Sequence, residues 1–156
     1  MHTIQVSPTA SKEARYQALL PQVRALVSGE PDPIANMANV AAALKEVFGF
    51  WWVGFYMVRQ NELVLGPFQG PVACTRIPYG KGVCGAAWAT GKTQIVPDVS
   101  LFPGHIACNA QSRSEMVVPF FGKTITGVLD IDSQFLHTFD ETDRQYVEAM
   151  LLYLDF

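Results

Sequence analysis

The N-terminal part of the chain carries apolar side chains at the spacing of two amphipathic helices. Over residues 12–27 the apolar positions recur with helical periodicity, and Ser11 precedes them as a plausible N-cap. A polar segment with two prolines, residues 28–33, ends this helix. Pro33 suits the first turn of a second helix with Asp32 as its cap, and the apolar pattern then continues to a break at Gly49. Two helices are therefore expected before the first strand.

Residues 51–58 are apolar at nearly every position, which is typical of an interior strand covered on both faces. The residues at 63–70 return as a hairpin partner after a turn at Asn61. The Trp52/Tyr56 pair is open to two interpretations, ordinary core packing or a wall of a ligand pocket. The two-residue period of the first strand defines its faces, with Trp52, Gly54 and Tyr56 on one and Trp51, Val53, Phe55 and Met57 on the other.

The second half of the chain has the pattern of a short helix, a long loop, a β-hairpin and a last helix. The short helix stops at Gly91, and strands at 115–121 and 124–132 flank a turn at Gly122 and Lys123. Thr138 or Asp140 caps the last helix. This order predicts an α+β domain with a central antiparallel β-sheet flanked by helices. On its last strand Val128, Asp130 and Asp132 share one face, and Leu129 and Ile131 share the other.

Composition and charge narrow the functional classes. The net charge is -3 and no Lys/Arg run exists, so nucleic acid is not an expected partner. No apolar run reaches the roughly 18 residues of a membrane span, and the start lacks the features of a signal peptide. No membrane association is therefore expected, and the predicted location is cytoplasmic. Thiols there stay reduced unless they are catalytic or sensing, and three cysteines cannot all pair with one another.

The stretch from Phe102 to Glu115 is a polar, turn-rich loop that carries Cys108 and leads into a strand beginning with a carboxylate. Loops longer than about 12 residues without structure of their own are usually functional or disordered. A cysteine on such a loop is placed to react, and the alternative is an inert, half-buried thiol. Four apolar residues are expected to anchor the loop: Val99, Leu101, Phe102 and Ile106.

Two glycine motifs and a potential zinc pair are weaker signals. Residues 80–85 match G-x-G-x-x-G, but Pro78 interrupts any strand before them and no second βαβ unit follows. The glycines more simply make a tight helix entry. The Gly-Lys-Thr at 91–93 has the wrong spacing for a phosphate loop, and it lies at a helix C-terminus, where the helix dipole repels phosphate.

His105 and Cys108 could supply half of a zinc site, but without a C-x-x-C pair no metal is expected.

Glu115, Asp130 and Asp132 form the second chemical feature of the chain. The two aspartates alone are consistent with the solvent face of an antiparallel sheet. With Glu115 on the neighbouring strand, three acids repel one another, so at least one should have a raised pKa and stay protonated near neutrality. A protonated acid beside a thiolate can donate to an oxygen that becomes basic during reaction, while the other carboxylates hold a cation.

Five short segments of the chain share one pattern: Trp52-Val-Gly-Phe-Tyr56, Gly80-Lys-Gly-Val-Cys84-Gly, His105-Ile-Ala-Cys108, Ser112-Arg-Ser-Glu115 and Gly127-Val-Leu-Asp-Ile-Asp-Ser133. Together they resemble the free methionine-(R)-sulfoxide reductases, which are single-domain GAF proteins. The similarity runs from roughly Tyr16 to Leu154, although the hairpin at 120–124 looks about a residue shorter than the usual family form. The resemblance implies one GAF domain over 1–156, with helices at about 11–48, sheet and site loop at about 51–133 and a last helix at about 140–154.

The resemblance also implies an activity: reduction of free L-methionine (R)-sulfoxide, with thioredoxin as electron donor and no cofactor. Cys108 matches the nucleophile, and Cys84 and Cys74 match the other redox cysteines. Glu115, Asp130 and Asp132 match acids that bind the substrate and polarise the sulfoxide, and Trp52 and Tyr56 match the pocket walls. The thiolate would attack sulfur, leave a sulfenic acid, and be resolved by a second thiol to a disulfide.

Several points stay open at this stage. Either Cys84 or Cys74 could resolve the sulfenic acid, and Arg113 either lowers the pKa of Cys108 or lies at the surface. The oligomeric state is open, with a homodimer among the options. The competing functional class is a GAF domain that senses a small ligand, or a thiol sensor without turnover. Three cysteines with three acids exceed what a bare binding pocket requires.

Overall fold

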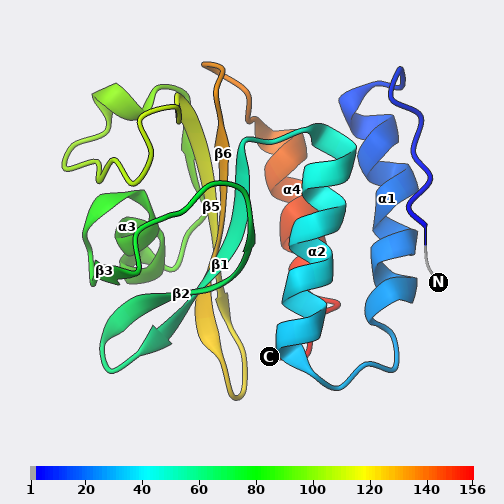
Figure 1. The fold of residues 1–156 in the computed structure, drawn as a ribbon, viewed down its shortest axis with the longest axis horizontal. Helices are drawn as coiled ribbons and strands as arrows, with labels where there is room; N and C mark the ends of the chain where they lie inside the picture. Colours follow the sequence, from blue (N-terminus) through cyan, green and yellow to red (C-terminus); the bar gives the residue numbers. More distant parts are fainter. Residues whose placement is uncertain (1–2) are drawn as a thin grey trace.

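A computed structural model describes residues 3–156 as a six-stranded sheet with helices on both sides (Figure 1). The strand order is β3-β2-β1-β6-β5-β4, and every neighbouring pair is antiparallel. The predicted α+β class is therefore confirmed. The strands are β1 (Trp52–Arg59), β2 (Glu62–Gln69), β3 (Arg76–Pro78), β4 (Gln94–Val96), β5 (Ser114–Phe121) and β6 (Thr126–Ser133). The helices are α1 (Lys12–Val27), α2 (Pro33–Phe48), α3 (Gly82–Thr90) and α4 (Glu141–Leu151), with a 3-10 turn, η1, at Val99–Leu101.

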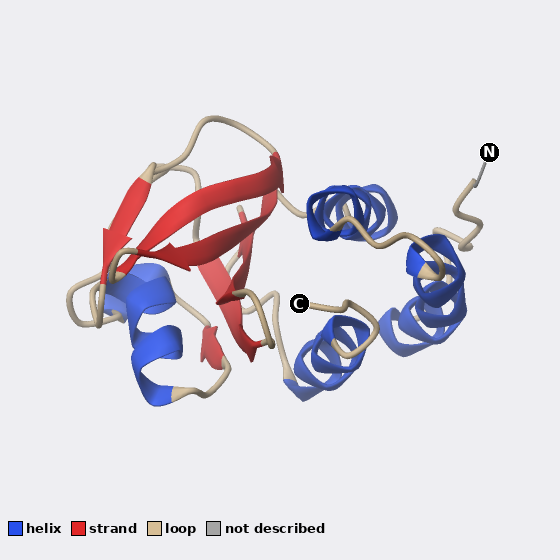
Figure 2. Ribbon diagram, turned by 90° about the horizontal axis from the view of Figure 1, so that it is seen from below, coloured by secondary structure: helices blue, strands red, loops and turns tan. Residues whose placement is uncertain are grey.

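Helices α1, α2 and α4 cover one face of the sheet, as Figures 1 and 2 both show. Their apolar stripes meet the inward side chains of β1, β5 and β6, among them Phe55 and Ile131, in the larger hydrophobic core. Ser11 caps α1, Asp32 caps α2, and Gly49 ends α2 in the left-handed conformation, as the pattern predicts. Asp140, not Thr138, caps α4, through a capping box with Asp143.

The opposite face of the sheet carries α3 and the long connecting loops (Figure 2). Here a smaller core forms around Trp52, Tyr56 and Val128, the face that the two-residue period assigns to them. Trp51 also packs against this core, contrary to prediction, because β1 begins at Trp52 and the alternation of the pleat does not extend to the residue before it. The sheet thus separates a scaffold of three helices from a face open to functional groups.

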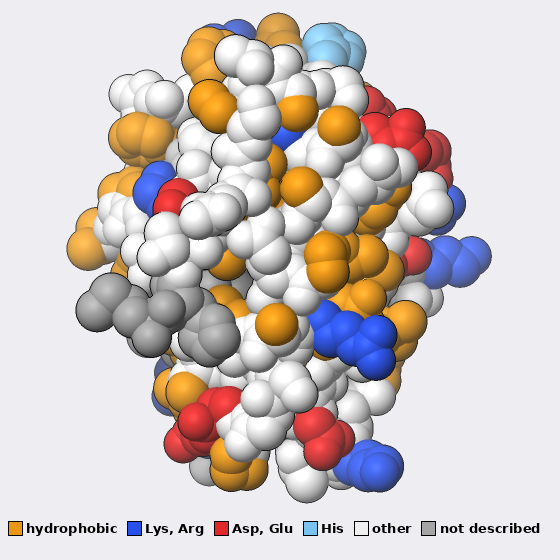
Figure 3. Space-filling model, turned by 90° about the vertical axis from the view of Figure 1, so that its right-hand side faces the viewer, with side chains coloured by type: hydrophobic (Ala, Val, Ile, Leu, Met, Phe, Trp, Pro, Cys, Tyr) orange, Lys and Arg blue, Asp and Glu red, His pale blue; other side chains and the backbone are white. Residues whose placement is uncertain are grey.

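Two further features differ from the sequence-based expectation. The short strand β4 was not expected, because a strand of three residues exists only through its pairing, here with β5. Leu101 is 79% exposed and does not anchor the site loop, since η1 turns it outward while Val99 is buried. Basic and acidic side chains are interspersed on the face beside α1 (Figure 3). Within residues 3–156, no helix is both long enough and apolar enough to cross a membrane.

Candidate active site

A small cavity of about 40 Å³ lies on the α3 side of the sheet. Strands β1, β5 and β6 form its floor, the start of α3 forms one wall, and the loops carrying residues 72–74 and 105–112 cover it. All eight residues predicted for the site or for its walls lie at this one cavity. Cys74 is bonded to Cys108 at its edge, and the other seven line it directly: Trp52, Tyr56, Cys84, Cys108, Glu115, Asp130 and Asp132.

The register of the sheet brings the acids and an aromatic side chain into one row. Trp52 on β1 pairs with Asp132 on β6, and Asp132 pairs in turn with Glu115 on β5. One step along, Asp130 pairs with Gly54, where an added Cβ would lie 2.2 Å from the Trp52 ring. A glycine is needed there because the indole ring lies over its backbone. The row therefore depends on the pairing of β1 with the β5–β6 hairpin, which lies far from it in the sequence.

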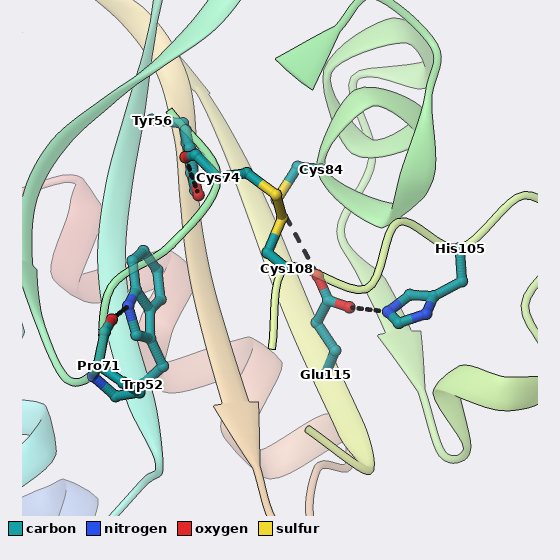
Figure 4. The surroundings of a disulfide bond; sticks show 8 residues. All are labelled: Trp52, Tyr56, Pro71, Cys74, Cys84, His105, Cys108 and Glu115. Atoms are coloured by element: carbon teal, nitrogen blue, oxygen red, sulfur yellow. Dashed lines mark hydrogen bonds and ion pairs between the residues drawn. A yellow bond between two sulfur atoms is a disulfide. The ribbon is translucent and has the colours of Figure 1, made fainter. Parts of the chain in front are cut away.

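The two aromatic side chains also hold the Cys74 loop in place. The Trp52 indole N–H donates to the Pro71 carbonyl at 3.0 Å, and the Tyr56 hydroxyl donates to the Cys74 carbonyl at 2.9 Å (Figure 4). Both aromatics are nearly fully buried. They are thus at once core residues and cavity walls, which the sequence had left as alternatives.

Cys74 and Cys108 form a disulfide at the edge of the cavity, with their Cα atoms 5.2 Å apart (Figure 4). Both lie on loops and are half-buried. Cys84 is a free, buried thiol on the first turn of α3, with its Sγ 4.0 Å from Glu115 Oε1. The three cysteines therefore differ in kind: two can reach each other as a redox pair, and the third is enclosed among acids.

The buried acids retain protons that exposed acids would lose. Burial, and then the charge of Asp132, raises the pKa of Glu115 and of Asp130 well above the usual range. Their mutual contact favours the proton on Asp130. Burial raises the pKa of Asp132 to about 6, against hydrogen bonding from Ser112 and the charge of His105. The expectation of at least one protonated acid in the cluster is confirmed.

The same surroundings make Cys84 a poor nucleophile. Burial, followed by the charges of Asp130 and Glu115, raises the pKa of the Cys84 thiol well above its ordinary value. A thiolate, not a thiol, attacks sulfur. Cys84 is therefore a neutral thiol at physiological pH.

Ser112 and His105 complete the acid cluster, and sequence reasoning assigned neither to it. The Ser112 hydroxyl donates to Asp132 Oδ1, and His105 Nε2 lies 3.7 Å from Glu115 Oε2 (Figure 4). Both residues belong to segments that carry the family resemblance, His105–Cys108 and Ser112–Glu115, so the sequence could have indicated them as site residues. One polar atom of the cluster stays unsatisfied: Asp130 Oδ1 is buried and has no hydrogen-bond partner in the described part of the chain.

Arg113 does not act on Cys108. Its side chain is exposed and does not line the cavity, while its backbone N–H donates to Ser133 and its carbonyl accepts from Val99. Of the two roles considered for Arg113, the structure supports the surface position.

A metal site is poorly supported by the arrangement of potential ligands. Cys84, Glu115 and Asp130 place one ligand atom each within 4.8 Å of one another. Metal binding needs deprotonated ligands, whereas this thiol and this carboxyl pair hold their protons. The His105/Cys108 half-site considered from the sequence is excluded in this state, because the Cys108 sulfur is bonded to Cys74.

Comparison with known proteins gives a consistent result. A family model described as "GAF domain" matches residues 35–154. "GAF domain-containing protein A" of Dictyostelium discoideum is 59% identical, over 93% of both chains. The "free methionine-R-sulfoxide reductase" of Escherichia coli is 44% identical, over 93% of this chain and 89% of its own. A crystal structure of the enzyme of that name from Neisseria meningitidis, in complex with its substrate, superposes with a TM-score of 0.95 at 53% identity, covering 99% of this chain and 94% of its own.

Proposed function

Because the chain belongs to the GAF domain family and, within it, to the free methionine-(R)-sulfoxide reductases, we propose that it reduces free L-methionine (R)-sulfoxide to L-methionine. The observation that carries the proposal is one cavity that combines a cysteine pair, three buried acids with raised pKa values and two aromatic walls. A thiol, a proton donor and a binding wall are what sulfoxide reduction by a protein thiol needs.

In the reduced protein, Cys108 is the proposed nucleophile. Its thiolate attacks the sulfoxide sulfur, an acid delivers a proton to the sulfoxide oxygen, and methionine leaves as that oxygen stays on Cys108 as a sulfenic acid. The substrate sulfur gains the two electrons that the Cys108 sulfur loses. Cys108 suits this role better than Cys84 because it lies on a half-buried loop and is not enclosed by carboxyl groups.

Asp130 is the proposed proton donor. In the hydrogen bond between Asp130 and Glu115, the proton resides on Asp130. Asp130 also lines the cavity, and its Oδ1 has no hydrogen-bond partner in the described chain. A carboxyl group kept neutral near pH 7 by burial can donate a hydrogen bond to a developing oxyanion. Asp132, whose pKa of about 6 leaves it ionised near neutral pH, would then contribute negative charge to the same end of the cavity.

Cys74 is the proposed resolving thiol. The Cys108 sulfenic acid condenses with the Cys74 thiol, forms the disulfide and releases water. The hydrogen bond from Tyr56 to the Cys74 carbonyl supports this choice, because it holds the loop over the cavity where Cys108 ends its reaction. Cys84 is the less suitable partner, since its thiol is buried and neutral.

An external dithiol, proposed to be thioredoxin, returns the enzyme to its reduced form. One thiolate of the donor attacks the Cys74–Cys108 bond through a mixed disulfide, and its second thiol releases the reduced enzyme. The half-buried position of both cysteines leaves their sulfurs within reach of the surface.

The acids also account for selectivity toward the free amino acid. Free methionine sulfoxide carries an ammonium group, whereas within a peptide that nitrogen is a neutral amide. A site built for a charged partner rejects the analogue that lacks it, by roughly 10⁴-fold in well-studied enzymes. Asp132, which lines the same cavity and ionises with a pKa of about 6, supplies a negative charge for such a partner near neutral pH.

The test is methionine formation from four compounds: the separated R and S sulfoxides of free methionine, and both sulfoxides of N-acetylmethionine amide. The proposal expects turnover of the free R form alone. Comparable turnover of the blocked compounds would refute the role of the acids. If the protein forms its disulfide with oxidants but produces no methionine, the alternative of a thiol sensor without turnover is correct.

A further inference from the structure

The two sulfurs of the disulfide differ in what surrounds them. Cys108 lines the cavity, whereas Cys74 lies at its edge, on the loop between β2 and β3. Inside the cavity there are only about 40 Å³ of free space, above the strands that carry the acids. An incoming thiolate therefore meets the two sulfurs under different conditions of access.

The direction of attack decides which sulfur a second protein can reach. In thiol–disulfide exchange the attacking thiolate approaches one sulfur along the S–S axis, from the side opposite the sulfur that leaves. To attack Cys108, the donor would have to approach from within the cavity, which is far too small for a protein loop. To attack Cys74, it approaches from outside the cavity, and Cys108 is the leaving group. Access therefore favours attack on Cys74.

The loop that carries Cys74 is held in place before and after the cysteine. The Trp52 indole N–H donates to the Pro71 carbonyl, and the Tyr56 hydroxyl donates to the Cys74 carbonyl (Figure 4). The carbonyl of Thr75 accepts a backbone hydrogen bond from β2. These three bonds fix the backbone around Cys74, so its sulfur should keep its position when the bond to Cys108 breaks.

The same loop exposes an apolar side chain beside the disulfide. Val72 is 86% exposed, although the backbone on both sides of it is held, and it also lines the cavity. The half-buried Ala73 and Ile106 line the cavity too, and we call these three residues the apolar rim. Single exposed apolar residues are common on protein surfaces, but interfaces bury such side chains at their centre. This rim borders a bond that an external dithiol has to reach.

We propose that the protein that donates the dithiol docks on the apolar rim and attacks Cys74. The inference rests on the proposed function, which requires reduction of the disulfide in every cycle. The donor thiolate forms a bond to the Cys74 sulfur, and the electron pair of the broken S–S bond leaves with Cys108 as its thiolate. The second donor thiol then displaces Cys74, so that the donor keeps a disulfide and the enzyme has two thiols. The nucleophile of the next turnover is thus released first.

The first experiment traps the mixed disulfide. The protein is oxidised with diamide, which forms the disulfide without any sulfoxide, and is mixed with a thioredoxin whose second active-site cysteine is replaced by serine. After acid quenching and alkylation of free thiols, trypsin releases the cysteines in separate peptides: 60–76 with Cys74, 82–92 with Cys84 and 93–113 with Cys108. Mass spectrometry should find thioredoxin on peptide 60–76 and the alkyl group on peptide 93–113. Thioredoxin on peptide 93–113 or 82–92 would overturn attack on Cys74.

The second experiment measures how fast reduced thioredoxin and dithiothreitol reduce the oxidised protein. Val72→Ser should slow reduction by thioredoxin roughly tenfold, the order expected for the loss of one buried valine contact. It should leave reduction by dithiothreitol unchanged within about twofold. Leu152→Ser is the matched control, because Leu152 is 84% exposed and follows α4 on the opposite side of the sheet. It should change neither rate.

An equal loss with both reductants in Val72→Ser, or no loss with thioredoxin, would overturn the docking role of the apolar rim. Reduction of wild type by thioredoxin that is no faster than by dithiothreitol at equal concentration would overturn it as well, because a small thiol would then suffice. Both experiments start from the disulfide and use no sulfoxide. Failure of wild type to form methionine would therefore refute the proposed function and not the site of attack.

Discussion

Asp132→Asn should stabilise the folded protein at neutral pH while it impairs the site. In the folded state the pKa of Asp132 is raised from 3.8 to about 6, chiefly by burial. A difference of that size corresponds to about 3 kcal/mol between the two protonation states. Asparagine carries no charge and can still accept the hydrogen bond from Ser112. The substitution therefore removes the cost of holding a carboxylate at this position.

The pH dependence follows from which state loses its proton first. The unfolded chain loses the Asp132 proton as pH rises through about 4, and the folded protein does so only near 6. Wild-type stability should therefore fall as the pH rises from about 4 to about 6. Above pH 6, Asp132 should cause no further loss of stability. Asp132→Asn should lack this contribution, so its advantage over wild type should grow by up to about 3 kcal/mol across the same window.

Urea unfolding at a series of pH values from 3.5 to 8, on the oxidised form of both proteins, measures this difference. Asp98→Asn is a control of opposite sign. Asp98 is half-buried at the surface, and hydrogen bonds from Ser100 lower its pKa, so it stabilises the folded state at neutral pH and loses that effect in acid. A constant stability difference between Asp132→Asn and wild type over this pH range would refute the assignment of a raised pKa to Asp132.

Three further predictions concern the cysteines and the cavity. Cys108→Ser should abolish single-turnover methionine formation, measured by chromatography after mixing with excess sulfoxide; a full yield would move the nucleophile elsewhere. Cys74→Ser should keep the single turnover but lose at least tenfold in thioredoxin-supported cycling, with a smaller loss in Cys84→Ser, and the reverse order would identify Cys84 as the resolving thiol. The oxidised protein should not bind methionine in calorimetry, because its cavity of about 40 Å³ is far below the roughly 300 Å³ of ordinary ligand pockets. Reduction should restore binding, and equal affinity in both redox states would contradict closure by the disulfide.

The local pattern of the sequence determined the helices, their caps and the two faces of the central strands. Alternation along a strand is a property of the backbone itself, so the shared face of Val128, Asp130 and Asp132 could be predicted without the structure. Ser11 and Asp32 could be predicted as caps for the same reason, since a cap bonds to N–H groups two or three residues away. The resemblance of short motifs then supplied the candidate chemistry.

Tertiary structure decided which of these residues meet. The row of Trp52, Asp132 and Glu115 depends on the pairing of three strands, and the choice of Cys74 over Cys84 as disulfide partner depends on how two loops cross the cavity. The exposure of Leu101 and the existence of the short strand β4 were also decided by tertiary structure, because both depend on neighbours that are distant in the chain. Burial of the acids, which raises their pKa values, likewise exists only once the sheet, α3 and the loops enclose them. Such properties arise from long-range contacts, and a local sequence pattern carries no direct record of them.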